Sequence, residues 1–152
     1  MRSTCDLLDE HPEAFVCLTQ FRQFGGVTNF AGEIATVRCH EDNVLLKERV
    51  SQSGGGRVLV VDGGGSLRVA LLGDRVGELA AQHGWVGLVV HGCVRDVVAL
   101  QALPIGIKAL GSSPRPSGKA GAGEIDVPLE FGGVTFRPGA MLYSDDDGIA
   151  VI

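Results

Sequence analysis

The chain has 152 residues, of which 45% are hydrophobic and 20% are charged, and its mean hydropathy is +0.22. This profile is typical of one compact globular domain and excludes the disordered and fibrous classes. A chain of this length buries about 68–70% of the surface that its unfolded form exposes. It therefore needs neither a disulfide framework nor a structural metal, and we expect any metal that it binds to be functional.

Charge and cysteine content narrow the functional classes further. The net charge is −5 with a pI near 5.3, and no lysine and arginine cluster is interleaved with aromatic residues, which argues against direct nucleic-acid binding. The four cysteines form no C-x-x-C pair, so we expect free thiols that are buried or half-buried. No signal-peptide pattern opens the chain, and no apolar run approaches the roughly 18 residues that span a membrane. These features predict a soluble, cytoplasmic protein.

The first third of the chain predicts a helix, a strand and a second helix. Residues 3–10 place hydroxyl and acidic groups where a first helical turn needs them. Residues 33–40 alternate between two faces, as in a half-buried strand. The segment NVLLKERVSQ, which begins at Asn43, has helical spacing of its apolar residues and is followed by SGGG, so we expect a helix that stops at glycine.

The centre of the chain predicts β-α-β units. An uninterrupted apolar run at residues 58–61 precedes Asp62 and three glycines, as in a strand covered on both faces that ends in a tight loop. Residues 67–84 predict a short strand, a break at Gly73 and a helix with Asp74 as its N-cap. The stretches WVGLVVHG, RDVVALQALP and IGIKALG then predict strand, short helix and strand. This alternation indicates an α/β fold with a partly parallel sheet.

The last third of the chain differs in composition and contains no helical pattern. Residues 112–124 form a loop rich in glycine, proline and serine, and a loop of this length in a small domain is expected to be functional or mobile. Residues 125–152 alternate strand-like pieces with turn dipeptides, which predicts an antiparallel meander packed as a second β layer. No domain boundary is recognisable, so we expect a single domain over residues 1–152.

Three motifs that contain glycine have ordinary interpretations. VDGGGS lacks both the Walker ending and the G-x-G-x-x-G spacing of nucleotide-binding loops. SGKAGAGE follows no predicted strand, and we interpret it as a flexible loop. SDDDGIAV has consecutive rather than alternating aspartates and no glutamate at the calcium-loop offset, so we interpret it as a charged turn before the last strand.

The strongest candidate site lies at two helix starts. In LLGDRVGELA, Gly73 permits a close backbone approach, and the amides of Asp74, Arg75 and Val76 offer an anion site; an ordinary capped helix is the alternative. GCVRDV has the same architecture one β-α unit later. Both helix starts would then lie at the carboxyl ends of neighbouring strands, where open α/β sheets bind their ligands.

Arg95 and Asp96 stand side by side in this second motif. Neighbouring residues face each other neither on a strand nor on a helix, so a salt bridge between them is not expected. A guanidinium suits a carboxylate or keto oxygen, and a carboxylate holds a hard divalent cation. The pair could therefore grip a 2-oxo acid that chelates a metal, or Asp96 could simply cap the helix.

Eight motifs occur in the order in which one known family has them. They are FGGVTNFAGEIATV, EDN, GRVLVVDGGGS, ALLGD, GWVGLVVHGCVRDV, GIKALGSSPRPSGK, FGGVTFRPG and DDDGIAV. Over nearly its whole length the chain resembles the regulator of ribonuclease E activity A (RraA) family, which is related to the 4-hydroxy-4-methyl-2-oxoglutarate aldolases. The resemblance implies a three-layer β/β/α swivelling-type domain with a mixed, partly parallel central sheet. It also implies a ring-shaped homotrimer with sites between subunits.

The activity that the resemblance implies is that of a class II aldolase, dependent on Mg²⁺ or Mn²⁺. It cleaves 4-hydroxy-4-methyl-2-oxoglutarate to two pyruvates and decarboxylates oxaloacetate. By the same resemblance, Gly73–Val76 binds substrate, Arg95 contacts it and Asp96 is the metal ligand. The chain departs from the family at Arg75, where asparagine is usual, which leaves the detail of substrate contact open. Ribonuclease E inhibitors of the family can lack the aspartate that this chain keeps at position 96, and this favours an aldolase over a pure inhibitor.

Both reactions share one difficult step, the formation of a pyruvate enolate, which the metal would stabilise. We expect Arg95 to stabilise the enolate oxygen. Asp74 is the second catalytic candidate, as the group that orients a water for proton transfer, although an N-cap role explains it equally well. Two other classes remain open: a regulatory protein that binds a ribonuclease E-type partner without catalysis, and a methyltransferase, for which no adenosylmethionine loop is recognisable.

Overall fold

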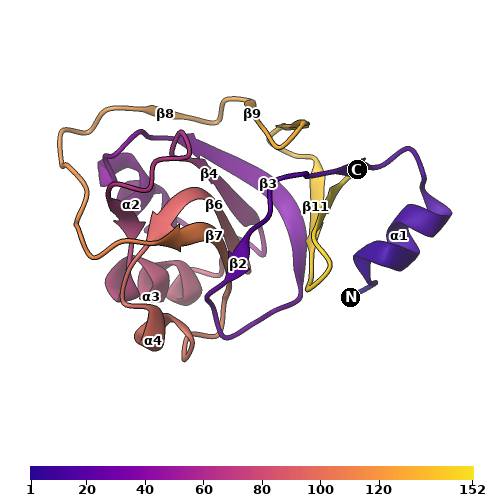
Figure 1. Ribbon diagram of the computed structural model, residues 1–152, viewed down its shortest axis with the longest axis horizontal. Helices are drawn as coiled ribbons and strands as arrows, with labels where there is room; N and C mark the ends of the chain where they lie inside the picture. Colours follow the sequence, from indigo (N-terminus) through magenta and orange to yellow (C-terminus); the bar gives the residue numbers. More distant parts are fainter.

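The computed structural model describes all residues from Met1 to Ile152, and a mixed sheet runs through its centre (Figure 1). Its middle consists of the strands β3 (Phe30–Arg38), β4 (Val58–Asp62), β6 (Gly87–Val94) and β7 (Gly106–Ser112), each parallel to its neighbour. The short strand β5 (Ala70–Leu72) also pairs with β6 in parallel. This arrangement confirms the predicted α/β class with a partly parallel sheet.

Helices cover one face of these parallel strands (Figure 1). They are α2 (Val44–Val50), α3 (Asp74–Gln82) and α4 (Val97–Leu100), and each follows a strand in the chain. Their buried side chains, such as Leu46 and Ala80, pack in one apolar core with every second residue of the strands. The alternation of side chains along a strand places the other residues on the opposite face.

A second apolar core lies on that opposite face. It joins strand residues such as Val60 and Val89 to Leu129, Phe136 and Leu142 from the C-terminal third of the chain. Layers of helix, sheet and β structure therefore stack in the predicted β/β/α order. The parallel strands read as continuous apolar runs because apolar layers cover both of their faces.

The C-terminal strands depart in part from the predicted meander. Strands β9 (Leu129–Phe131) and β10 (Val134–Phe136) form a separate hairpin, whereas β11 (Met141–Ser144) and β12 (Ile149–Val151) extend the central sheet. The nine-residue strand β3 makes this possible, because its first residues pair with β11 and its later residues pair with β4. The prediction of a half-buried strand here was also wrong in part, since residues 34–37 are buried on both faces.

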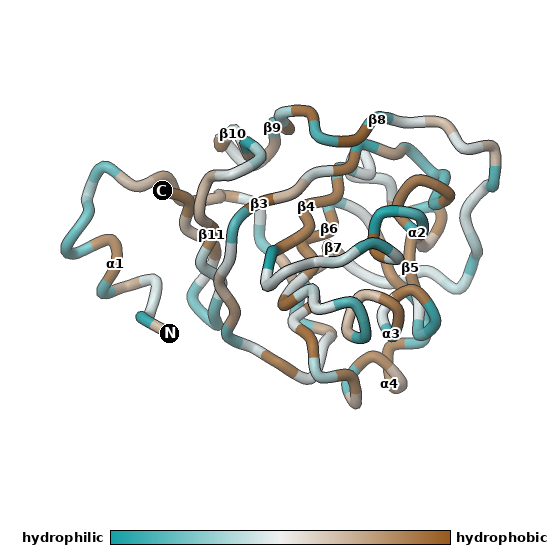
Figure 2. Tube along the Cα trace, turned by 180° about the vertical axis from the view of Figure 1, so that it is seen from behind, coloured by the Kyte–Doolittle hydropathy of each residue, from teal (hydrophilic) through white to brown (hydrophobic).

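The first helix and three two-residue strands lie at the margins of the fold. Helix α1 (Thr4–Glu10) begins as predicted, with the Ser3 hydroxyl accepting a hydrogen bond from the Asp6 amide at 3.1 Å, and it lies at one end of the molecule (Figure 2). The strands β1 (Phe15–Val16), β2 (Arg22–Gln23) and β8 (Glu124–Ile125) were not predicted. None of the helices is long and apolar enough to cross a membrane.

All four cysteines are free, as the spacing predicts. Cys17, Cys39 and Cys93 are buried, and burial raises the pKa of the Cys39 thiol to about 12. Cys5 is exposed on α1, so the expectation of burial fails for this thiol. The three buried thiols therefore serve as small apolar groups of the core.

Candidate functional site

The two predicted helix starts lie side by side. Strand β5 leads into α3 and β6 leads toward α4, and the two strands pair in parallel with Ala70 opposite Cys93 and Leu72 opposite Val94. The Arg95 amide continues this contact by donating to the Leu72 carbonyl at 2.9 Å. The fold therefore brings both motifs to one edge of the sheet, at the carboxyl ends of its strands.

A pocket of about 1230 Å³ opens at this edge. Its walls come from α2, from the start of α3, from the segment between β6 and α4, and from the loop at residues 116–119. The six residues that the sequence singled out all line it: Gly73, Asp74, Arg75, Val76, Arg95 and Asp96. The structure thus places the whole predicted set around one cavity.

Asp96 has a left-handed backbone, with φ 56° and ψ 44°. This conformation costs a residue other than glycine about 1–3 kcal/mol, and it breaks the alternation that would turn neighbouring side chains apart. Arg95 and Asp96 consequently line the same pocket, and they form no ion pair with each other.

The Asp96 carboxylate bonds to the other helix. Asp96 stands at the cap position of α4 but makes no side-chain bond there, so simple capping of its own helix is wrong. Instead its Oδ2 accepts a hydrogen bond from the Asp74 amide, the first of α3, at 3.1 Å. The carboxylate is exposed, and Oδ1 makes no hydrogen bond within the chain. One oxygen is thus fixed and the other is available to a ligand.

Gly73 makes room for this carboxylate. Its backbone is extended, so its conformation alone does not require glycine. A Cβ atom at this position would collide with Asp96 Oδ2 and would lie 3.2 Å from Arg95 Cγ. The close approach predicted for Gly73 is therefore the approach of both side chains of the Arg95–Asp96 pair.

The prediction of Asp74 as N-cap was wrong by one residue. Gly73 is the N-cap, and Asp74 is the first residue of α3, where its Oδ1 accepts from the Arg75 amide at 2.8 Å. Carboxylates of the protein therefore already bond two of the three amides of the predicted anion site. Fewer backbone amides of the helix start are therefore free to bind a ligand, and side chains must supply more of the ligand contacts.

The opposite wall of the pocket was not predicted from the sequence. Asn43, the N-cap of α2, and Lys47 within α2 line it, and Ser117 and Lys119 line it from the glycine-rich loop. The motif SGKAGAGE was interpreted as a flexible loop because its lysine fits no nucleotide motif. A signal was present in the EDN motif, whose polar residues directly precede α2 and hold this loop.

Hydrogen bonds to Asp42 connect the glycine-rich loop to the start of α2. The buried Asp42 carboxylate accepts hydrogen bonds from the amides of Val44 at 3.1 Å, Ala120 at 2.6 Å and Gly121 at 3.0 Å. Burial alone would raise the pKa of Asp42, but these amides together hold the pKa below its usual value. The long loop is thus tied to the pocket by a charged group that remains ionised.

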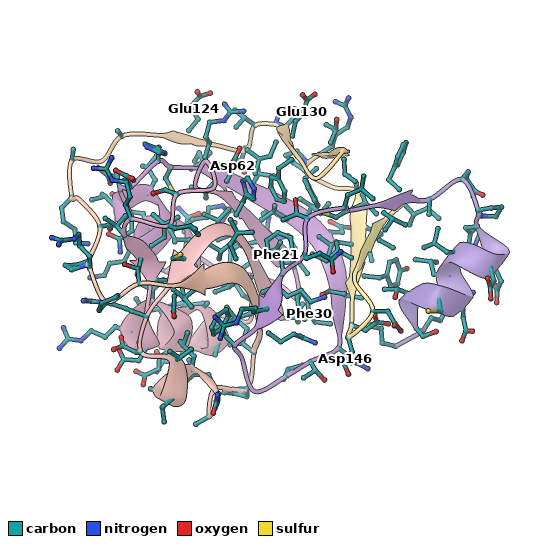
Figure 3. The ribbon with its side chains drawn as sticks, viewed as in Figure 1. Phe21, Phe30, Asp62, Glu124, Glu130 and Asp146 are labelled. Carbon is teal, nitrogen blue, oxygen red and sulfur yellow. The ribbon has the colours of Figure 1, made fainter.

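The motifs VDGGGS and SDDDGIAV form turns away from the pocket. Asp62, labelled in Figure 3, accepts from the Gly64 amide at 2.8 Å and lies 3.3 Å from Nδ1 of His91, whose ring stacks on Phe131. SDDDGIAV forms the turn between β11 and β12, as predicted. Neither motif contributes to the pocket lining.

The donor set suits a hard divalent cation better than a soft one. No group of three or more histidine, cysteine, aspartate and glutamate side chains is close enough to hold a metal. Asp96 offers an exposed carboxylate with one free oxygen, and the missing Cβ at Gly73 leaves room for it; Asp74 and Glu48 are the other carboxylates of the pocket lining. Mg²⁺ commonly keeps several waters and takes only one or two carboxylates, so this site fits Mg²⁺ or a similar ion.

The fold and the site together define an α/β protein with a pocket, lined by charged residues, at the carboxyl ends of parallel strands. Residues 4–151 match the family model for RraA-like proteins, described as Aldolase/RraA. The chain belongs to this family.

Solved structures of relatives support the assignment. A protein of Geobacillus kaustophilus, named S-adenosylmethionine:2-dimethylmenaquinone methyltransferase, is 49% identical, with a TM-score of 0.97 over 99% of this chain and 94% of its own. The RNA-processing inhibitor RraA of Thermus thermophilus is 46% identical, with a TM-score of 0.97 over 100% and 93% of the two chains. An RraA-family protein of Streptomyces coelicolor, described as an unusual member of the RNase ES inhibitor family, is 26% identical with a TM-score of 0.76 over 97% and 78%.

Proposed function

We propose that the protein is a lyase dependent on a divalent metal, Mg²⁺ or Mn²⁺, that acts on 2-oxo acids. It cleaves 4-hydroxy-4-methyl-2-oxoglutarate to two pyruvates and also decarboxylates oxaloacetate. The observation that supports this most is that Arg95 and Asp96 line one pocket with their charges unpaired. The family description, which joins aldolases with RraA proteins, is compatible with this chemistry.

Arg95 is placed to bind the reacting half of the substrate. Its side chain is exposed in the pocket, and its single bond, from Nη1 to the Pro114 carbonyl, is long at 3.5 Å. A guanidinium can donate two parallel hydrogen bonds to a carboxylate and an adjacent keto oxygen. Arg95 would therefore orient the 2-oxo acid and stabilise negative charge as it builds on the keto oxygen.

Asp96 would hold the cation, which when bound supplies Lewis-acid polarisation of the 2-oxo group. In the aldol cleavage, the C4 hydroxyl loses its proton, the C3–C4 bond breaks, and its electron pair passes into the enolate of the departing pyruvate. In the decarboxylation of oxaloacetate, the C3–C4 bond of that substrate breaks, CO₂ leaves, and the electron pair passes into the enolate of pyruvate. In both reactions C3 then takes up a proton.

Asp74 is the proposed proton-transfer group. One of its oxygens is fixed by the Arg75 amide, while the side chain as a whole lines the pocket. A carboxylate held in this way can orient a water toward the C4 hydroxyl or toward C3. Gly73, Arg75 and Val76 complete the proposed substrate contacts on this wall.

The test is a coupled assay with oxaloacetate. Pyruvate release is followed through lactate dehydrogenase, with Mg²⁺ present, with EDTA, and with Mg²⁺ but no protein. We expect a protein-dependent rate that EDTA abolishes and added Mg²⁺ restores. A rate equal to the protein-free control, for both oxaloacetate and 4-hydroxy-4-methyl-2-oxoglutarate, would contradict the proposal.

A second candidate function has its support in the Thermus relative, which is named as an RNA-processing inhibitor. In this alternative the chain binds a ribonuclease E-type protein through its acidic surface and needs no metal. Inhibition of such a ribonuclease that is equal for the parent protein and Asp96→Asn, together with no turnover of 2-oxo acids, would favour this alternative. For either function we propose a homotrimer, which equilibrium sedimentation would test.

The name of the Geobacillus relative raises methyl transfer as a third class. We expect no binding of S-adenosylmethionine in a calorimetric titration, because no adenosylmethionine-binding loop is recognisable in the sequence. Stoichiometric binding would reopen this class.

A further inference from the structure

The pocket is larger than the proposed chemistry alone requires. Its volume of about 1230 Å³ exceeds the range of about 300–1,000 Å³ that is typical of small-molecule sites. The reacting half of a 2-oxo acid would occupy only the end near Arg95 and Asp96. The other end, between α2 and the loop at residues 116–119, remains for the rest of the substrate.

This second end carries two lysines and one exposed carboxylate, Glu48, which makes no ion pair with either of them. Lys47 and Lys119 both line it, and neither makes an ion pair. Elsewhere on the surface, Arg2, Arg38 and Arg68 each pair with a glutamate. The two lysines outnumber the one carboxylate at this end, so it keeps a net positive charge that an anionic ligand can neutralise.

Lys119 is held in place by neutral acceptors. Its Nζ donates to Asn43 Oδ1 at 2.6 Å and makes two longer contacts with Ser117, at 3.3 and 3.4 Å. Asn43 in turn donates through Nδ2 to the Leu71 carbonyl at 2.9 Å, in the strand that leads to Gly73. The ammonium is therefore fixed relative to the proposed reacting end, while none of its partners cancels its charge.

We infer that Lys119 binds the second carboxylate of the substrate and so selects dicarboxylic over monocarboxylic 2-oxo acids. Lys47 adds positive charge to the same end. The inference rests on the proposed function, because it names the far half of the same substrate. An ammonium that is positioned before binding loses little freedom when it pairs with a carboxylate, and such a charge-assisted bond is strong.

The test is equilibrium binding of two unreactive probes in the presence of Mg²⁺. 2-Oxoglutarate carries a second carboxylate and 2-oxobutyrate does not. The parent protein should bind 2-oxoglutarate about 10–100-fold more tightly, and Lys119→Gln should lose most of this ratio. Arg115→Gln is the matched control, because Arg115 is an exposed cation of the same loop outside the pocket lining, and it should keep the parent ratio.

The outcomes separate this inference from the proposed function. If the parent binds both probes equally, or if Lys119→Gln keeps the parent ratio, the assignment of Lys119 is overturned while binding of 2-oxo acids stands. If neither probe binds to the parent, the proposed function fails and the assignment of Lys119 fails with it.

Discussion

Two aspartates in different regions of the molecule use their carboxylates in opposite ways. Asp145, in the turn between β11 and β12, is buried and accepts from the Thr4 amide and hydroxyl, both at 2.7 Å, and from the Asp147 amide at 3.0 Å. Asp96, at the pocket rim, is exposed and accepts a single backbone bond. Both carboxylate oxygens of Asp145 accept hydrogen bonds within the chain, whereas Oδ1 of Asp96 accepts none and can still bind a ligand.

The cations of the two regions differ in the same way. Lys108 is buried, and its Nζ donates to the carbonyls of Asp145 at 2.6 Å and Gly148 at 3.1 Å. Arg95 is exposed, with one long bond to a carbonyl. A buried charge whose hydrogen bonds are all made within the chain holds the fold together. An exposed charge that is anchored on one side only is available to a ligand.

The largest expected effect is on turnover, from the loss of Arg95. Arg95→Ala should lower kcat for oxaloacetate by about 10²–10³-fold, because a preorganised donor to the developing charge is lost. Steady-state kinetics would measure this. Arg137→Ala, which removes an exposed arginine outside the pocket, should leave the rate unchanged. A parent-like rate in Arg95→Ala would remove this residue from the mechanism.

The next effect tests the space that the missing Cβ at Gly73 leaves for the Asp96 carboxylate. Gly73→Ala should displace the Asp96 carboxylate and lower Mn²⁺ affinity by about 10–100-fold, as loss of ligand positioning commonly does. Isothermal titration would measure the affinity. Gly111→Ala is the control, because a Cβ at Gly111, in the neighbouring strand β7, would meet only Cys93 Sγ at an ordinary 3.9 Å. Equal Mn²⁺ affinities in the two variants would show that the space at Gly73 does not position the Asp96 carboxylate for metal binding.

The smallest effect concerns stability alone. Asp145→Asn should lower the free energy of unfolding by about 1–3 kcal/mol at pH 7, because the Thr4 and Asp147 donors lose a charged acceptor. Chemical denaturation would measure it. Asp146→Asn, in the same turn, removes an exposed carboxylate that bonds only the Gln23 side chain, and it should cost less than about 0.5 kcal/mol (Asp146 is labelled in Figure 3).

The Asp145 effect should depend on pH in a defined direction. Burial alone would raise the pKa of Asp145, but the bonds from Thr4, Asp147 and Gly148 hold the pKa below its usual value. The contribution to stability is therefore fully present above the unfolded value of about 3.9 and is lost as the pH falls through the lower, folded value. The difference between the parent and Asp145→Asn should shrink below about pH 4. A difference that is constant from pH 7 to pH 3 would contradict this assignment.

Much of the fold was predictable because it depends on local patterns. The apolar runs at residues 58–61 and 87–90 are typical of strands covered on both faces, and the residues around Ser3 marked the first helix. The division of β3 between two partners was not predictable, because pairing of strands distant in the sequence leaves no mark in the alternation of either strand. The two-residue strands have too few residues to show a period.

The candidate site was predictable on one wall only. Gly73 and the Arg95–Asp96 pair lie in short motifs whose chemistry is readable along the chain. The other wall depends on Asp42, which reaches across 78 residues to the amide of Ala120 and thereby places Lys119. The left-handed backbone of Asp96 was equally hidden, since nothing in GCVRDV indicates it.

The comparison of the two aspartates has one direct test, which is Mn²⁺ binding followed by electron paramagnetic resonance. The parent and Asp145→Asn should each bind one ion per chain, and Asp96→Asn, in which the amide oxygen can still accept from the Asp74 backbone, should lose this binding. Retention of the parent affinity in Asp96→Asn would contradict the account, because the exposed carboxylate at the pocket rim would then hold no metal.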